Sequence, residues 1–295
     1  MEWIESEHNP RVQHWRRISE SARARRESCE IWLEGARLVA EGLRSISKSS
    51  AVGTADEPQA VLLVTEQDDA AERPEIHDLI RRAQALGVHQ AMVSHRVWAR
   101  LSQVEQSQGV ALVMSRPEPA HSVEFVLSGA RAWQDWVVLD GLQDPGNVGN
   151  LLRTAAAAGV AGAVLLKGTT EAFSPKALRA GMGAQFLLPV WEGVARSDWR
   201  AWADDRSVRT LLTLAPHVPQ TQSLWESHTL SDPQGVAWVL GQEGAGLDPA
   251  WMDSGRYVGL SIPQAEGLES LNVTVAAGVC LFERARHRSL AERQA

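Results

Sequence analysis

Hydrophobic residues recur along this chain with two different periods, and the alternation between the two predicts an α/β protein. In residues 11–46 apolar side chains recur three and four positions apart, so we expect this region to be helical throughout. Short apolar runs and amphipathic stretches then alternate, which indicates a small α/β module over residues 1–117. Its expected strands cover 59–65, 90–93 and 109–114, and its expected helices cover 75–86 and 97–101.

The second part of the chain predicts a parallel sheet. Its apolar runs are hydrophobic at nearly every position, as in strands that helices cover on both faces. The expected strands cover 136–139, 163–166, 211–214, 236–240 and 257–262, and the expected helices cover 148–158, 175–182, 199–203 and 272–288. Residues 115–120 contain two prolines and predict a linker, so we expect a second domain over 118–295.

Composition narrows the class of protein. The 295 residues are 44% hydrophobic, enough for the cores of two domains, and the formal net charge of −7 argues against indiscriminate binding to polyanions. Cys29 and Cys280 lack the spacing of a metal or redox motif, and the N-terminus lacks the apolar run of a signal peptide. No stretch is long enough to span a bilayer. We therefore expect a cytoplasmic protein without a membrane segment or a bound metal.

Positive charge is nevertheless concentrated in two places. Six arginines lie between Arg11 and Arg26, and a second basic cluster at 284–288 closes the last predicted helix. Each cluster is either a solvated helix face or a contact surface for RNA, and the sequence leaves both interpretations open. An exposed Trp15 or Trp98 would add a surface for base stacking, although buried packing is the usual role of tryptophan.

The most informative segment lies where the first strand of the second domain leads into a helix. Residues 139–155 read LDGLQDPGNVGNLLRTA, an acidic turn followed by a helix that carries Asn147 and Arg153. The first amides of a helix lack backbone partners, so such a turn can bind a polar or anionic ligand. Alternatively, Asp144 or Asn147 only caps the helix and Arg153 is only solvated.

Two further segments place glycine-rich or polar backbone directly after a strand. Residues 240–247 read LGQEGAGL, and residues 262–272 read IPQAEGLESLN. Ligands of open α/β sheets bind at the carboxyl ends of strands, where glycine lets the backbone approach a ligand closely. The glycine spacing is neither the dinucleotide fingerprint nor a P-loop, which disfavours a dinucleotide-dependent enzyme.

In this order and with this internal spacing, the three segments resemble the motifs of the SpoU (TrmH-like) ribose methyltransferases. The similarity covers about residues 118–295, with a middle helix at 174–184, and extends loosely to an N-terminal RNA-binding extension. It implies methyl transfer from S-adenosylmethionine to an RNA ribose 2′-hydroxyl, on a trefoil-knotted α/β domain that acts as a homodimer. Large-subunit ribosomal RNA is the expected substrate by analogy. The alternatives are a tRNA 2′-O-methyltransferase and a non-catalytic RNA-binding or ribosome assembly factor.

The resemblance also assigns catalytic roles. Arg153 would lie beside the ribose hydroxyl and either accept its proton or clamp the neighbouring phosphate; a guanidinium is ordinarily a donor. Asn147 would position Arg153 or the ribose, and Glu243 would orient the guanidinium through paired hydrogen bonds. Ser270 and Asn272 match the pair at the start of the last helix, for which capping is the alternative role.

The cofactor would be held bent, mainly by backbone atoms of the late loops. The matching positions are Leu214, Gly241, Ile262 and Leu271. Thr274 and Gln264 stand where many relatives carry serine and methionine, which does not put the expected activity in doubt.

Overall fold

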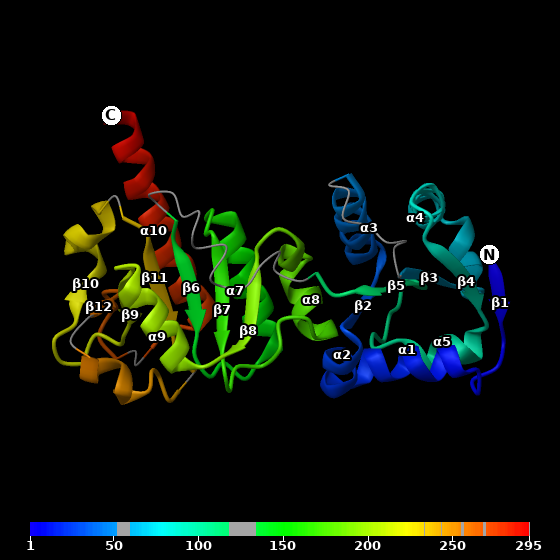
Figure 1. Ribbon diagram of the computed structural model, residues 1–295, viewed down its shortest axis with the longest axis horizontal. Helices are drawn as coiled ribbons and strands as arrows, with labels where there is room; N and C mark the ends of the chain where they lie inside the picture. The colour runs from blue at the N-terminus through cyan, green and yellow to red at the C-terminus, as the bar shows by residue number, and fades with distance from the viewer. Residues whose placement is uncertain are drawn as a thin grey trace. The chain divides into compact units, whose positions relative to one another are not determined.

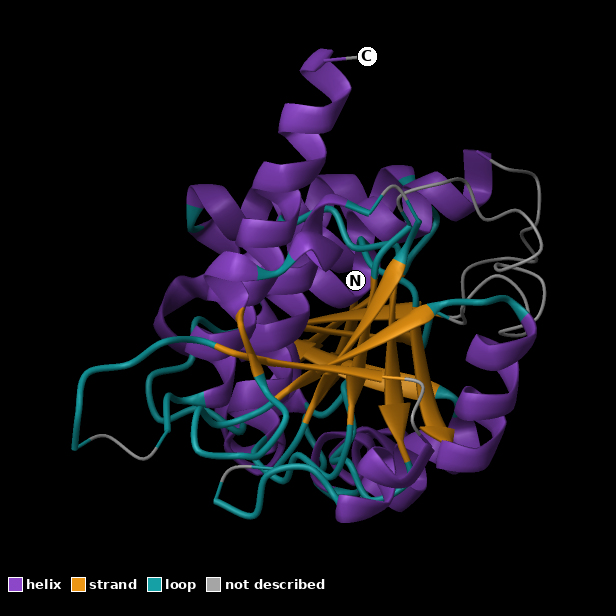
Figure 2. Ribbon diagram, turned by 90° about the vertical axis from the view of Figure 1, so that its left-hand side faces the viewer, coloured by secondary structure: helices purple, strands orange, loops and turns teal. Residues whose placement is uncertain are grey.

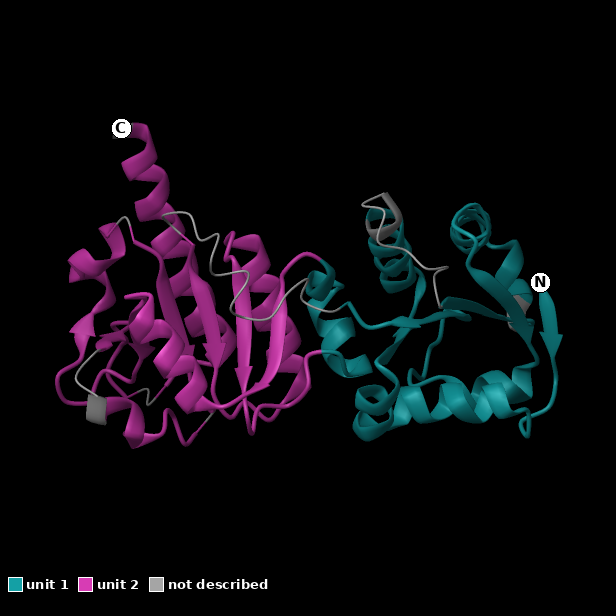
Figure 3. Ribbon diagram, in the orientation of Figure 1, with its two compact units in different colours: residues 1–117, 173–186 teal, residues 118–172, 187–295 magenta. Residues whose placement is uncertain are grey.

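The computed structural model describes residues 1–51, 60–117, 134–232, 234–242, 244–254, 257–267 and 270–294 (Figure 1). The chain divides into two compact units, coloured separately in Figure 3. Unit 1 consists of Met1–Pro117 and Phe173–Phe186, and unit 2 consists of Glu118–Ala172 and Leu187–Ala295. Among the described residues, none of the helices combines the length and hydropathy needed to cross a membrane.

Unit 1 contains a mixed sheet with the strand order β1-β4-β3-β5-β2. Strands β1, β4 and β3 run parallel to one another, whereas β5 pairs antiparallel with both β3 and β2. The strands are β1 (Glu2–Ile4), β2 (Glu30–Glu34), β3 (Ala60–Thr65), β4 (His89–Val93) and β5 (Val110–Ser115). The helices are α1 (Pro10–Glu20), α2 (Ala22–Ser28), α3 (Ala36–Ala51), α4 (Pro74–Ala85), α5 (His95–Leu101) and α8 (Pro175–Gly181), the last of which packs against β2.

Strand β2 lies inside the region that we expected to be helical throughout, so that prediction is wrong. Cys29 ends α2 in the left-handed conformation with φ at 56°, and Gly35 follows β2 with φ at 98°. Between them Ile31, Trp32 and Leu33 are all fully buried. Three consecutive buried side chains suit a strand with both faces covered, whereas an amphipathic helix would expose one of them.

Unit 2 is built on a parallel sheet, as predicted, with the strand order β10-β12-β9-β11-β6-β7-β8 (Figure 1). Its strands are β6 (Trp136–Leu139), β7 (Gly162–Leu166), β8 (Val190–Val194), β9 (Arg209–Thr213), β10 (Gln222–Ser223), β11 (Val236–Leu240) and β12 (Tyr257–Ser261). Its helices are α7 (Pro145–Ala157), α9 (Arg196–Asp205) and α10 (Val273–Gln294). The sequence prediction missed β8 and the very short β10. In β8, Glu192 and Gly193 interrupt the apolar run that would have marked a buried strand.

Tryptophan side chains fill much of the core beside this sheet. The rings of Trp136 and Trp191 lie 5.5 Å apart, and a Cβ on Gly162 would lie only 2.4 Å from the Trp136 ring. Glycine at position 162 therefore makes room for the indole. The expected packing role of Trp191 is confirmed. Trp15 and Trp98 are buried as well, each with 3% of its surface exposed, so neither presents a face on which a base could stack.

Candidate active site

The segments singled out in the sequence leave neighbouring strands at one edge of the unit 2 sheet. Strands β12, β9, β11 and β6 are consecutive in the sheet and parallel, so their carboxyl ends lie at the same edge (Figure 1). Leu214 follows β9, Gly241 follows β11 and Ile262 follows β12. The Leu214 amide donates to the Leu260 carbonyl at 2.9 Å. The structure thus brings three of the four backbone positions predicted to hold a cofactor to a single edge.

Gly241 begins a tight turn in which two stretches of backbone pass very close to each other. The Gln242 amide donates to the Gly246 carbonyl at 3.0 Å, and the Gly246 amide donates to the Gln242 carbonyl at 2.9 Å. A Cβ on Gly241 would lie 2.5 Å from the Gly246 carbonyl oxygen, so a larger residue requires the backbone to move. A Cβ on Gly246 would meet nothing within 4 Å, so the backbone of this turn faces open space there.

Asn147 meets the start of the last helix. It lies in the first turn of α7, where the Asp144 side chain accepts a hydrogen bond from the Gly146 amide at 3.0 Å and caps the helix. The Thr274 hydroxyl donates to Asn147 Oδ1 at 3.3 Å. Asn272 Oδ1 in turn accepts the Thr274 amide at 2.9 Å and thereby caps α10. The first and third sequence motifs are therefore joined directly, with Asn272 in the capping role.

Arg153 lies two turns along α7 and is exposed. Among the described residues, no hydrogen bond or ion pair involves its guanidinium. It lies roughly 120° around the helix from Asn147, which is half-buried towards α10, so the expected convergence of these two side chains within one chain is not seen. Glu243 lies outside the described residues, and its pairing with Arg153 stays a prediction. Ser270 is exposed and Leu271 is half-buried immediately before the α10 cap.

A charged cluster that the sequence analysis missed lies at the same edge. We call Arg196, Asp140, Asp248 and Trp251 the Arg196 cluster. Arg196 is the first residue of α9, and its guanidinium donates to Asp140 at 2.9 Å and to Asp248 at 2.8 Å. The Trp251 indole N–H donates to the same Asp140 oxygen at 2.6 Å. Asp140 and Arg196 are 56 positions apart, and no local pattern in the sequence links them.

Carboxylates pair with several arginines of the basic helices in unit 1. Arg16 pairs with Glu20 at 2.9 Å and Arg23 pairs with Glu27 at 2.6 Å, and Arg11 is bound to Glu2. Arg25 is buried and donates to the Ile18 and Ser19 carbonyls, and His14 contacts Glu30. The sequence could not distinguish a solvated face from an RNA contact, and the exposed Arg17 and Arg26 leave both interpretations open.

Arg284, in the basic cluster at 284–288, anchors the last helix, a role that neither of the two alternatives anticipated. Arg284 is 1% exposed, and its guanidinium contacts the Asp135 carboxylate at 3.2 Å. It also donates to the carbonyls of Leu230 and Asp232 at 2.8 Å and of Gln234 at 2.6 Å. A charge this deeply buried and fully paired holds α10 against the sheet and is inaccessible to RNA.

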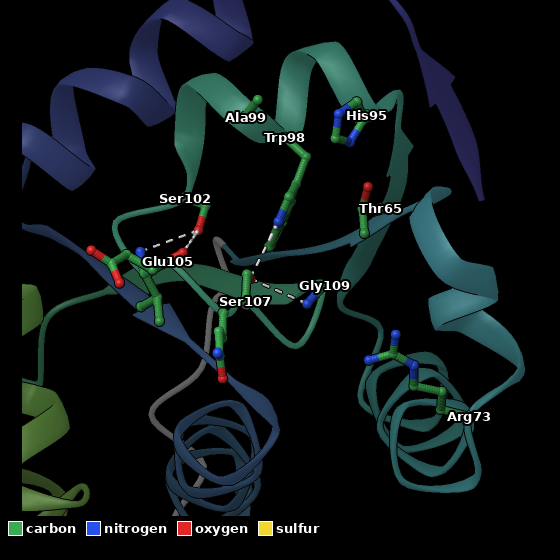
Figure 4. Close-up of a pocket in the computed structure, with 11 residues that line it drawn as sticks. Thr65, Arg73, His95, Trp98, Ala99, Ser102, Glu105, Ser107 and Gly109 are labelled. Atoms are coloured by element: carbon green, nitrogen blue, oxygen red, sulfur yellow. Dashed lines mark hydrogen bonds between the residues drawn. The ribbon is translucent and has the colours of Figure 1, made fainter.

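Unit 1 contains a polar cavity of about 380 Å³ between α5 and the loop that follows it (Figure 4). Arg73, His95 and Trp98 contribute to its lining. Glu34 fixes the loop beside it, since its carboxylate accepts the Ser107 hydroxyl and the Gln103 amide, each at 2.9 Å. Most of the lining lies between His95 and Gly109, and Thr65 and Arg73 complete it from earlier in the chain.

Comparison with known proteins settles the family. Residues 135–282 match the model of the SpoU rRNA Methylase family, and this range covers half of the chain and every segment described above at the sheet edge. The chain belongs to this family. The predicted SpoU-type α/β fold is therefore confirmed.

Individual relatives and structures agree with this assignment. The 23S rRNA (guanosine(2553)-2′-O)-methyltransferase RlmP of Bacillus subtilis is 28% identical over 96% of this chain and 98% of its own. An uncharacterised tRNA/rRNA methyltransferase of Synechocystis is 33% identical over 71% of this chain and 72% of its own. The AdoMet-bound rRNA methyltransferase of Sinorhizobium meliloti superimposes with a TM-score of 0.78 at 25% identity, over 97% of this chain and 98% of that one.

Proposed function

We propose that this protein is an S-adenosylmethionine-dependent RNA methyltransferase that modifies a ribose 2′-hydroxyl of large-subunit ribosomal RNA. The observation that carries the proposal is the similarity to RlmP, which spans both units and nearly the whole of each chain. Similarity confined to unit 2 would have supported only the methyl-transfer reaction. The similarity to RlmP also covers unit 1, the region expected to bind RNA.

The sheet edge fits S-adenosylmethionine. The turn at 241–247 offers bare backbone to open space at Gly246, where a side chain is absent. Among the described residues, Gln264 Oε1 is buried without a hydrogen-bond partner and can accept an N–H group of a ligand. When bound, the cofactor supplies a methyl group on a positively charged sulfur, which is open to displacement by an oxygen nucleophile.

The residues of this chain then have to align and polarise the ribose hydroxyl. Alignment of the reacting groups contributes up to roughly 7–11 kcal/mol in favourable cases. Asn147 is suited to positioning, because the Thr274 hydroxyl donates to its Oδ1 and so ties the first turn of α7 to the start of α10. Asn272 supports this arrangement by capping α10, which sets the place of Thr274.

Arg153 is proposed to clamp the RNA phosphate next to the target ribose and to stabilise the negative charge that develops on the oxygen. Its exposure on α7 suits contact with a large polyanion, and a guanidinium keeps its proton in water. The proton of the hydroxyl then leaves to solvent. Since Arg153 and Asn147 of one chain lie on different faces of α7, the site is best completed by a second copy.

A homodimer is accordingly part of the proposal. Three large apolar side chains of α10 are exposed: Val275 at 54%, Phe282 at 51% and Leu290 at 42%. Their spacing of seven and eight residues places them along one side of the helix. Helices pair in water through apolar side chains arranged in this way. In Figure 2 the last turns of α10 project beyond the rest of unit 2. This stripe supports dimerisation through α10.

The trefoil knot is also part of the proposal. Strand β12 lies between β9 and β10 in the sheet, although it follows both in the chain. The connection from β9 to β10 therefore has to cross the end of β12, and a Cβ on Gly259 would lie 3.7 Å from both Gln220 and Thr221 of that connection. The crossing that this strand order requires supports threading of the segment after β12 past the connection. Such topologies are rare exceptions.

The remaining proposals concern unit 1 and the compartment. Unit 1 is proposed to capture the RNA substrate, supported by the RlmP similarity across its length and by the polar cavity beside Arg73. The cytoplasm is the proposed compartment, supported by Cys29 and Cys280, both of which are free thiols.

Radiolabelled methyl transfer tests the activity. Purified protein is incubated with methyl-labelled S-adenosylmethionine and ribosomal RNA from cells that lack the gene. Arg153→Ala is compared with Asn150→Ala, which alters another exposed residue on α7. We expect label in large-subunit RNA with the wild type and Asn150→Ala and a loss of at least roughly 100-fold with Arg153→Ala, as for removal of a charge-stabilising group. Label in tRNA, or none above the Arg153→Ala background, would contradict the proposal.

A further inference from the structure

The Arg196 cluster joins three chain segments that meet at the proposed cofactor edge. Asp140 directly follows β6, Arg196 begins α9, and Asp248 directly follows the turn at 241–247. The same guanidinium contacts both carboxylates, at 2.9 Å and 2.8 Å, and lies 5.6 Å from the centre of the Trp251 ring. One side chain therefore bridges the end of a buried strand and the exit of the glycine turn.

Burial separates this cluster from an ordinary surface ion pair. The Asp140 side chain is 9% exposed, Trp251 is 2% exposed, and only 28% of the Arg196 side chain is accessible. The Trp251 indole donates to Asp140 at 2.6 Å, so the carboxylate holds both a cation and a neutral donor. The Arg196–Asp140 pair is therefore held in place, whereas Asp248, with 48% of its side chain exposed, is the accessible end of the cluster.

The charges of the cluster stabilise one another. Burial opposes the charged form of Arg196, but the hydrogen bond to Asp248 and the charges of both carboxylates raise its pKa above the ordinary value. The backbone N–H of Ala250 and the Arg196 guanidinium lower the pKa of Asp248. The pair is therefore fully ionised at neutral pH.

The two ends of the glycine turn are held by different means. At its entrance, β11 pairs on both sides and Gly241 allows the close backbone contact with Gly246. At its exit, the hydrogen bonds of Asp248 and Trp251 to Arg196 and Asp140 fix the chain. Without the second attachment the exit would be free to move relative to β6, and binding through backbone atoms depends on their positions to within about 0.5 Å.

We propose that Arg196 is a positioning residue for the cofactor turn: by bridging Asp140 and Asp248 it fixes the described backbone of the turn, at 241–242 and 244–247, in the geometry that binds S-adenosylmethionine, without touching the cofactor itself. The inference rests on the proposed function. It predicts that loss of Arg196 weakens cofactor binding by about ten- to a hundredfold, the range typical of residues that orient the direct contacts of a ligand site.

Calorimetric titration of the full-length protein with S-adenosylhomocysteine tests the inference without relying on activity. Arg196→Ala is compared with Arg206→Ala, a matched control at the other end of α9. Arg206 also pairs with an aspartate, at 2.8 Å, and also lies over a tryptophan ring, at 5.3 Å, but it has no contact with the turn. We expect the Kd to rise about tenfold or more for Arg196→Ala and to stay within about twofold for Arg206→Ala. Arg196→Lys, which reaches one carboxylate but cannot span two, recovers part of the affinity.

Kinetics separate positioning from a structural role. Arg196→Ala raises the KM for S-adenosylmethionine and leaves kcat at saturating cofactor unchanged, whereas general loosening of the fold lowers kcat as well. Asp248→Asn provides a second variant if Arg196→Ala does not fold, because Asp248 is 48% exposed and its loss leaves the buried Asp140 paired. If the wild type does not bind S-adenosylhomocysteine, the proposed function fails. If the wild type binds and both variants bind equally well, the positioning role is refuted.

Discussion

Arg284 anchors the last helix, and replacing it with methionine is the sharpest test of how unit 2 is held together. Methionine keeps an unbranched apolar stem of similar reach but removes the guanidinium. The change leaves the Asp135 carboxylate, which is 4% exposed, with Arg288 at 3.4 Å and the Val236 amide at 3.1 Å. It also removes the donor that serves three backbone carbonyls, at Leu230, Asp232 and Gln234.

The expected loss follows from these contacts. Removing one partner of a buried ion pair costs about 3–5 kcal/mol, because the remaining charge is left in a poor environment. The orphaned carbonyls add to the cost unless water reaches them. Since a domain of this size is stable by about 5–15 kcal/mol, we expect Arg284→Met to remove a large part of the free energy of unfolding of unit 2.

Urea unfolding measures this loss. Arg286→Met is the matched control, because Arg286 is two residues away on α10 and pairs with Glu283 at the surface; we expect no measurable change. In the double variant with Asp135→Asn, the second substitution costs less than it does alone, with a coupling free energy of about 0.5–3 kcal/mol. Equal stability of Arg284→Met and Arg286→Met would refute the description of Arg284 as a buried anchor.

Three further predictions address the turn, the thiols and the dimer. Gly241→Ala places a Cβ 2.5 Å from a backbone oxygen, so we expect it to abolish S-adenosylhomocysteine binding in calorimetry. Gly278→Ala is the control, because its Cβ has ordinary contacts, and it should bind normally. Equal affinities of the two variants would contradict the tight turn. Burial raises the pKa of Cys280 to about 12, so this residue stays a thiol at pH 8. We therefore expect a disulfide reagent to label only the exposed Cys29 in the native protein, and to label both cysteines in urea. Phe282→Glu places a charge in the proposed dimer stripe and shifts the protein to a monomer in light scattering; an unchanged mass would exclude α10 from the interface.

The sequence predicted the elements of unit 2 well where burial was continuous along a strand. Strands β6 and β11 are buried at every position, and their uninterrupted apolar runs marked them and their parallel pairing. The same reasoning failed at β2, where an apolar run of only three residues does not separate a strand from part of a helix in the sequence, and at β8, where Gly193 breaks the run. Local sequence patterns therefore predicted a strand correctly only where consecutive residues are all buried and all apolar.

The candidate site was predictable to the extent that it depends on local backbone. The glycine turn at 241–247 and the helix starts near Asn147 and Asn272 were evident from residue types that a turn or cap requires. The long-range pairs were not. Arg284 contacts Asp135 from 149 positions away, and nothing near either residue in the sequence indicates that Arg284 is buried.

The most direct test of the central claim is a map of ribose methylation in large-subunit ribosomal RNA from cells with and without the gene, complemented by the wild type or by Arg153→Ala. We predict one or a few 2′-O-methyl marks that disappear on deletion, return with the wild type and stay absent with Arg153→Ala. Identical maps in all four strains, or a lost mark that Arg153→Ala restores in full, would contradict the account.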